Sequence, residues 1–92
     1  MDTIKKLFAT IKQRQKYRPK ESYTAELFKK GTDEITKKIG EEAIEVIIAG
    51  KNKDKEEITY EMADLWYHCL VLLAHSDITP EDIYGELEKR FK

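Results

Sequence analysis

Two apolar segments with helical periodicity, each carrying a pair of acidic residues, most strongly constrain the fold that this chain can adopt. The first pair is Glu42 and Glu45, and the second is Glu61 and Asp64. Residues three apart in a helix lie on one side of it, about one turn from each other. Each segment therefore projects two carboxylates from one side of its helix.

The acids lie at the border of the predicted core rather than opposite it. At about 100° per residue, Glu42 falls inside the apolar stripe of the first segment and Glu45 flanks that stripe. In the second segment, Glu61, Asp64 and His68 line one flank of the apolar stripe. The predicted stripes consist of Ile35, Ile39, Val46 and Ala49 in the first segment and Ile58, Met62, Leu65, Cys69 and Leu72 in the second.

A short reversal separates the two segments, at Gly50 and Asn52-Lys53. The two helices are therefore expected to form an antiparallel hairpin. Pairing the sequence about this turn places Glu45 level with Glu61, and Glu42 level with Asp64. Four carboxylates that face each other repel, and a bound cation relieves that repulsion.

Oxygen ligands alone favour a hard cation, so we predict an Mg²⁺ site formed by Glu42, Glu45, Glu61 and Asp64. The alternative is that these acids are ordinary solvated surface charge, because charged residues make up 38% of the chain. A di-iron bundle is disfavoured because it requires a Glu-x-x-His motif, whereas His68 follows Asp64 by four residues.

Length and composition predict one domain, residues 1–92, that gains stability from a partner subunit. The net charge of -1 gives no support for nucleic-acid binding. The start lacks the apolar region of a secretory signal, and the longest apolar run, residues 69–74, is too short to span a bilayer. We therefore expect a cytoplasmic protein without a membrane partner.

The other segments also indicate helices, and none alternates with the period of a strand, so the predicted fold is all-α. A first helix is expected over residues 2–15, followed by a loop around Pro19. Ser22 is expected to cap a short helix that ends at Gly31, and Thr32 or Asp33 to cap the next, which stops at Gly50. Capping signals at Asp54 and Thr79 predict two further helices.

Two further predictions concern packing. Gly40 lies inside a predicted helix, where a glycine costs about 1 kcal/mol relative to alanine, so we expect another group, either a packed helix or a phosphate, close to its backbone. Ile83, Leu87 and Phe91 are expected to form the apolar face of the last helix. A second apolar stripe in residues 60–74 is expected to form the subunit interface, and it consists of Tyr60, Ala63, Tyr67, Leu70 and Ala74.

Lys38 lies one turn before Glu42 and is a candidate for binding a substrate phosphate, with an ion pair to Glu42 or Glu34 as the alternative. His68 has three open roles: orienting a carboxylate, contacting the substrate, or packing. The basic loop around Arg18 and Lys20 is a weaker candidate for binding phosphate.

The acidic motifs resemble those of the MazG-type all-α nucleotide pyrophosphohydrolase superfamily: Glu41-Glu42-x-x-Glu45 and Glu61-x-x-Asp64. Within it, the resemblance narrows to the phosphoribosyl-ATP pyrophosphohydrolase family of histidine biosynthesis. The segments that favour this family are Ser22-Tyr23-Thr24-Ala25, Gly31, Lys37-Lys38-Ile39-Gly40-Glu41-Glu42-Ala43-Ile44-Glu45, Lys51-Asn52 and Ala63-Asp64-Leu65-Trp66-Tyr67-His68.

This resemblance implies an Mg²⁺-dependent homodimer that hydrolyses phosphoribosyl-ATP to phosphoribosyl-AMP and pyrophosphate, with no second activity in the same chain. Glu41 is then a candidate catalytic base or carboxylate orienter. Lys38 and His68, with the segment Ser22, Tyr23 and Thr24, are candidates for substrate binding. Two alternatives remain: a house-cleaning hydrolase of noncanonical nucleoside triphosphates, and a non-catalytic helical dimerisation module.

Overall fold

The computed structural model describes residues 2–91, and over this range it contains five helices and no strand. The predicted all-α fold is therefore confirmed. The helices are α1 (Thr3–Tyr17), α2 (Tyr23–Lys30), α3 (Thr32–Asn52), α4 (Lys55–His75) and α5 (Pro80–Glu88).

Three of the predicted helix starts are confirmed by their capping hydrogen bonds. The Ser22 hydroxyl accepts from the Ala25 backbone N–H at the start of α2, and the Asp54 carboxylate accepts from two backbone N–H groups of α4. Thr79 and Asp82 form a reciprocal capping box at α5. These side chains satisfy backbone donors that have no partner within the helix.

The boundaries of α3 differ from the predicted ones at both ends. Gly31 precedes α3 with φ of 90° and no side chain caps it, so neither Thr32 nor Asp33 is the cap. The helix continues through Gly50 to Asn52, and Lys53, which follows it, adopts the left-handed conformation with φ of 57°. The turn to α4 is therefore shorter than predicted, since Asp54 already caps the next helix.

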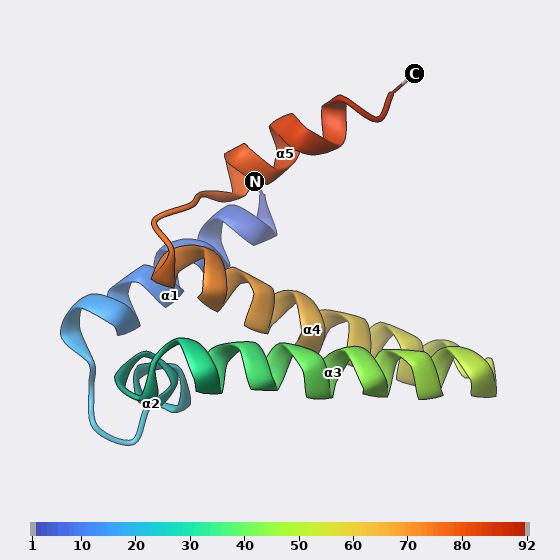
Figure 1. Ribbon diagram of the computed structural model, residues 1–92, viewed down its shortest axis with the longest axis horizontal. Coiled ribbons are helices and arrows are strands. Elements are labelled where there is room, and N and C mark those ends of the chain that lie inside the picture. Colours follow the sequence, from blue (N-terminus) through green and yellow to red (C-terminus); the bar gives the residue numbers. More distant parts are fainter. Residues whose placement is uncertain (1, 92) are drawn as a thin grey trace.

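Helices α3 and α4 run antiparallel as the predicted hairpin, and α1 and α2 pack against one end of it (Figure 1). The core lies at that end, where α1 contacts α4 and α2 contacts α3. Its fully buried side chains are Ile11, Ile35 and Val71. Leu27, Phe28, Leu70 and Ala74 complete the core.

The buried face of α4 differs from the predicted stripe. Its buried residues are His68, Leu70, Val71 and Ala74, whereas the predicted stripe is only half-buried. Leu70 and Ala74 were assigned to the subunit interface, and that assignment is wrong because both are buried within the chain. Residues 65–74 are apolar nearly all round the helix, so periodicity could not decide which face α1 and α2 would cover.

Two other packing predictions differ from the structure. A Cβ added at Gly40 would meet no atom of the described chain within 4 Å, so no helix within residues 2–91 packs closely on this backbone, and a phosphate there stays a prediction. Phe91 lies beyond the end of α5 and is 84% exposed, so it does not contribute to the apolar face of that helix.

The turn end of the hairpin keeps an exposed apolar surface. Ile44, Ile47 and Ile48 on α3 are about half exposed or more, as is Tyr60 on α4. α5 extends away from the hairpin (Figure 1), and a groove lined by apolar residues lies between it and α4. Within residues 2–91, none of the helices combines the length and the apolar character needed to cross a membrane.

Candidate active site

An acidic cluster lies midway along the hairpin, where α3 faces α4. Glu42, Glu61 and Asp64 each contribute one carboxylate oxygen to a group in which all three atoms lie within 4.8 Å of one another. The predicted facing of the two acid pairs therefore occurs for three of the four residues. Glu45 lies outside this group, although its charge acts on Glu61.

Glu42 is the most buried member of the acidic cluster, with 8% of its surface exposed. The pKa of Glu42 is raised, mainly by a hydrogen bond with the Asp64 carboxylate and secondly by burial. The charges of His68 and Lys38 lower it. Its placement inside the apolar stripe of α3 is thus confirmed. A carboxylate here is costly to keep charged without a cation.

Glu61 lies nearer to solvent than Glu42. The pKa of Glu61 is raised, mainly because the side chain is partly removed from water and secondly because Glu45 and Asp64 are negatively charged. Repulsion among these acids is the condition that a bound divalent cation relieves. An all-oxygen donor set on two rigid helices fits a hard ion such as Mg²⁺, whose remaining ligands are typically water and phosphate oxygens.

Lys38 connects Glu41 to the acidic cluster. Its Nζ lies 3.2 Å from Glu41 Oε1 and 3.7 Å from Glu42 Oε1. The hydrogen bond to Glu41 contributes most to a raised pKa of Lys38, so this side chain is held protonated. The predicted intrahelical ion pair with Glu42 is present, and Lys38 also remains partly exposed beside the cluster.

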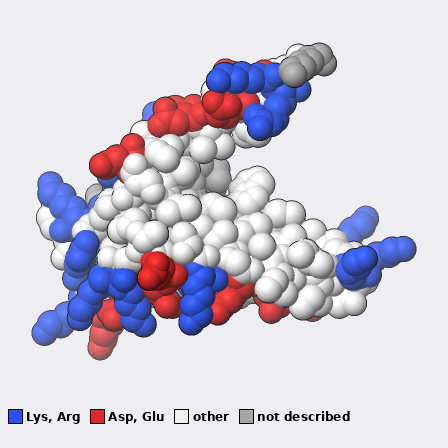
Figure 2. Space-filling model, in the orientation of Figure 1, with Lys and Arg blue, Asp and Glu red and all other residues white. Residues whose placement is uncertain are grey.

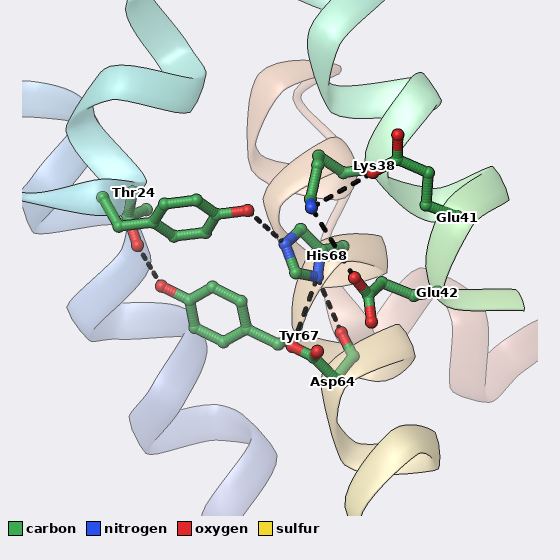
Figure 3. A network of polar contacts seen from close by, with 8 residues as sticks. Thr24, Lys38, Glu41, Glu42, Asp64, Tyr67 and His68 are labelled. Atoms are coloured by element: carbon green, nitrogen blue, oxygen red, sulfur yellow. Dashed lines mark hydrogen bonds and ion pairs between the residues drawn. The ribbon is translucent and has the colours of Figure 1, made fainter. Parts of the chain in front are cut away.

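His68 is buried between Asp64 and helix α2 (Figure 3), with 3% of its surface exposed. Its Nδ1 lies 2.8 Å from the backbone oxygen of Asp64 and 3.6 Å from Asp64 Oδ1. A carbonyl oxygen only accepts, so Nδ1 carries the hydrogen and donates to it. In the imidazole with this one hydrogen, Nε2 then accepts a hydrogen bond from the Tyr23 hydroxyl at 2.8 Å. His68 thus connects Asp64 to α2.

The segment Ser22, Tyr23 and Thr24 has three different environments. The Ser22 hydroxyl is used in capping α2, and Thr24 is buried with its hydroxyl hydrogen-bonded to that of Tyr67. Tyr23 is 53% exposed although its hydroxyl is fixed by His68. Of the three, Tyr23 therefore presents the most surface to a ligand. Burial raises its pKa, which keeps the hydroxyl protonated as a donor.

Sequence reasoning missed the role of Tyr67. This residue was assigned to the subunit interface, but it joins α2 to α4 through Thr24, 43 residues away in the chain. Its ring also packs edge to face on His68, with ring centroids 5.6 Å apart. Its position next to His68 was the available signal, since neighbouring polar residues on an otherwise apolar helix suggest a shared contact.

A comparison with protein families matches residues 4–91 to the family described as phosphoribosyl-ATP pyrophosphohydrolase. This range covers nearly the whole chain. The chain belongs to the phosphoribosyl-ATP pyrophosphohydrolase family. The resemblance inferred from the acidic motifs and the Ser22-Tyr23-Thr24 segment is therefore confirmed.

Individual members of the phosphoribosyl-ATP pyrophosphohydrolase family are similar over almost the whole chain. The chain is 56% identical over 90 residues to the phosphoribosyl-ATP pyrophosphatase of Geobacter sulfurreducens, covering 98% of this chain and 83% of that protein. It is 57% identical over 89 residues to the enzyme of the same name from Bacillus mycoides, covering 97% and 83%.

A longer relative in this family contains a region similar to the whole chain. The histidine biosynthesis bifunctional protein HisIE of Caldanaerobacter subterraneus is 52% identical over 92 residues, which are 100% of this chain and 45% of that protein. In a bifunctional relative, therefore, this phosphoribosyl-ATP pyrophosphohydrolase domain occupies about half of the polypeptide.

Proposed function

We propose that this chain hydrolyses phosphoribosyl-ATP to phosphoribosyl-AMP and pyrophosphate, an early step of histidine biosynthesis in the cytoplasm. The observation that carries the proposal is the acidic cluster of Glu42, Glu61 and Asp64 in a chain of this family. The substrate is inferred from the names of the similar proteins from Geobacter and Bacillus, which are both phosphoribosyl-ATP pyrophosphatases. A triphosphate is a suitable ligand for a cation held by few carboxylates.

Mg²⁺ is the proposed cofactor, with Glu42, Glu61 and Asp64 as its protein ligands and Glu45 as a fourth carboxylate nearby. When bound, Mg²⁺ would supply charge neutralisation on the phosphates and lower the pKa of a water molecule. The role of these residues is to fix the ion from two sides, since α3 contributes Glu42 and α4 contributes the other two.

The reaction breaks the anhydride bond between the α- and β-phosphates. A water oxygen forms the new bond to phosphorus, the water loses a proton, and pyrophosphate leaves. Lys38 is held protonated beside the acidic cluster, where its charge can stabilise negative charge on the leaving group. Glu41 is the proposed base or orienter, because it contacts Lys38 while remaining accessible to solvent.

Substrate positioning is proposed for the α2 segment. Tyr23 is the favoured contact, with Ser22 and Thr24 holding α2 in place. His68 was proposed as a substrate contact, and its burial favours acting on the substrate through Tyr23. Because the Tyr23 hydroxyl is already held by its hydrogen bond to His68, this side chain loses little conformational entropy when a ligand binds.

A homodimer is proposed because the turn end of the hairpin is incomplete by itself. Ile44, Ile47 and Ile48 are 57%, 59% and 49% exposed on one helix. Contiguous apolar surface of this kind is typical of a subunit interface. A second copy placed against it would complete a helical bundle around α3 and α4.

Pyrophosphate release tests the proposed function. Wild type should act on phosphoribosyl-ATP with Mg²⁺, and Glu42→Gln should lower kcat at least about a hundredfold by removing a carboxylate from the cation site. Glu56→Gln is the control, because Glu56 is an exposed acid on the same helix as Asp64 but outside the acidic cluster. A panel of nucleoside triphosphates should be poorer substrates. Activity restricted to those nucleotides would contradict the proposal.

A further inference from the structure

One stretch of this chain is enriched in basic residues. Residues 12–30 contain seven lysines and arginines against two glutamates, although the whole chain has a net charge of -1. Figure 2 shows Lys and Arg gathered over the end of the molecule where α1 and α2 meet. The acidic cluster lies beyond this basic end, midway along the hairpin. This arrangement suits an elongated ligand with an anionic group at each end. One anionic end would bind the cation at the acidic cluster, and the other would bind the basic residues.

A pocket lies at the basic end, between the C-terminus of α1 and the start of α2. Its cationic lining residues are Arg18, Lys20 and Lys29. Glu21 and Glu26 also line it. Lysine and arginine donors bind phosphate oxygens, whereas carboxylates accept hydrogen bonds from sugar hydroxyls. A pocket with both kinds of group suits a sugar phosphate.

The loop that forms this pocket is held in a defined conformation. Arg18 and Glu21 both have positive φ, 46° and 65°, which is uncommon for residues other than glycine. The Arg18 backbone N–H donates to Arg14 O, and its side-chain Nε donates to Gln15 O. The Ser22 N–H donates to Pro19 O. The pocket is thus organised before a ligand binds, which reduces the entropy cost of binding.

Tyr23 connects this pocket to the acidic cluster. Tyr23 lines the pocket, and its hydroxyl donates a hydrogen bond to His68, which in turn contacts Asp64. The ring is about half exposed between the two sites. A ligand with one end at the acidic cluster and the other in the pocket would pass over this ring, and an aromatic face suits a purine or ribose there.

We propose that the pocket of Arg18, Lys20 and Lys29 binds the phosphate monoester of the phosphoribosyl group, with Glu21 and Glu26 available to its ribose hydroxyls. This inference rests on the proposed function, since it assigns the second anionic end of phosphoribosyl-ATP. The pocket is then the part of the site that distinguishes phosphoribosyl-ATP from ATP, which carries the same triphosphate but no second phosphate.

The test uses the double variant Lys20→Gln, Lys29→Gln. Arg18 is left unchanged because its backbone and side chain also cap α1. The variant should raise KM for phosphoribosyl-ATP about tenfold, the usual effect of losing a charge-assisted hydrogen bond, with kcat changed less than about twofold. Calorimetric Mg²⁺ binding should match that of wild type, and circular dichroism should show the same thermal unfolding.

The matched control is Lys12→Gln, Lys16→Gln. It removes the same charge from a neighbouring surface, since both residues lie on α1 outside this pocket. Its KM should stay within about twofold of wild type. Equal increases in both double variants would show only general electrostatic attraction and overturn the inference, as would an unchanged KM in the Lys20, Lys29 variant.

Competition by ribose 5-phosphate gives an independent measurement. It should inhibit wild type more strongly than ribose does, and the Lys20, Lys29 variant should lose this difference. Equal inhibition of wild type by the two compounds would contradict the inference. Failure of the proposed function gives a different result, because wild type would then release no pyrophosphate from phosphoribosyl-ATP.

Discussion

The two ends of the α3–α4 hairpin have the same secondary structure but different surroundings. At one end, α1 and α2 cover the hairpin, and Ile35 and Val71 are fully buried. At the turn end, Ile47 is 59% exposed and Tyr60 is 70% exposed. The acidic cluster lies between them, where the cover by α2 stops. The difference shows that the small helices stabilise one end, and that the other end is available to a partner.

Truncation of one isoleucine at each end should give the largest contrast. Ile35→Ala should lower the free energy of unfolding by about 2–5 kcal/mol, because it leaves a cavity in a packed core. Ile47→Ala should cost far less in a dilute, monomeric sample, because the side chain is already exposed. Urea unfolding at two protein concentrations measures both. A concentration-dependent loss for Ile47→Ala would assign this residue to an interface, whereas equal losses at low concentration would contradict the contrast.

Charge introduced at the turn end should act on assembly rather than folding. Burial of one isoleucine side chain contributes about 1.5–3 kcal/mol, so Ile48→Lys should raise the dimer dissociation constant at least about tenfold. Sedimentation equilibrium measures this constant. Lys37→Gln, a change to an exposed residue nearer the covered end of α3, is the control. An Ile48→Lys protein that dimerises as wild type does would place the interface elsewhere.

The junction between the two ends is tested through Tyr23. Tyr23→Phe removes only the hydroxyl that donates to His68, and one neutral hydrogen bond contributes about 0.5–1.5 kcal/mol. KM for phosphoribosyl-ATP should therefore rise about threefold to tenfold, while Mg²⁺ affinity measured by calorimetry stays the same. Tyr17→Phe, a change to an exposed tyrosine on α1, is the control. A loss of Mg²⁺ affinity instead would indicate that Tyr23 acts by holding Asp64.

The pH dependence of stability should give the smallest effect. The folded-state pKa of Glu42 is raised by Asp64 and by burial, so folding favours its protonated form. This contribution to stability is present below the ordinary pKa of a glutamate and is lost as the pH rises through the raised value. Without Mg²⁺ at neutral pH, Glu42→Gln should therefore unfold at a higher temperature than wild type.

Addition of Mg²⁺ should reverse that order of stability. The ion stabilises the folded wild type by binding to it, and the Glu42→Gln protein should gain less. Differential scanning calorimetry at several pH values checks both effects. If Glu42→Gln is less stable than wild type in metal-free buffer at neutral pH, the carboxylate makes a favourable contact that this account omits.

Much of the fold and site could be predicted from the sequence. The hairpin, the caps at Ser22, Asp54 and Thr79, and the burial of Glu42 follow from local periodicity and capping, which act over a few residues. The grouping of Glu42 with Asp64 followed from the position of one turn. The role of Glu45 could not be settled in this way. A difference of part of a helical turn in the direction of its side chain decides whether Glu45 binds the ion or only lies beside the site.

The contacts made by α2 could not be predicted. Nothing local links Tyr23 to His68 or Thr24 to Tyr67, since more than 40 residues separate the members of each pair. The buried face of α4 could not be predicted either. Leu70 and Val71 are buried, whereas Leu65 and Cys69 are only half-buried. A helix that is apolar on several sides can pack on any of them.

The sequence by itself therefore determined which segments are helices, where most of them start, that two of them bring acids together, and the family. Its signals are periodicity, capping and motif order, which all depend on neighbours along the chain. Only the tertiary structure decided which face of α4 is buried, how His68 connects Asp64 to Tyr23, and that a basic pocket lies beside that tyrosine. Those features depend on how α1 and α2 pack against the hairpin, and packing is a property of surfaces that meet in space.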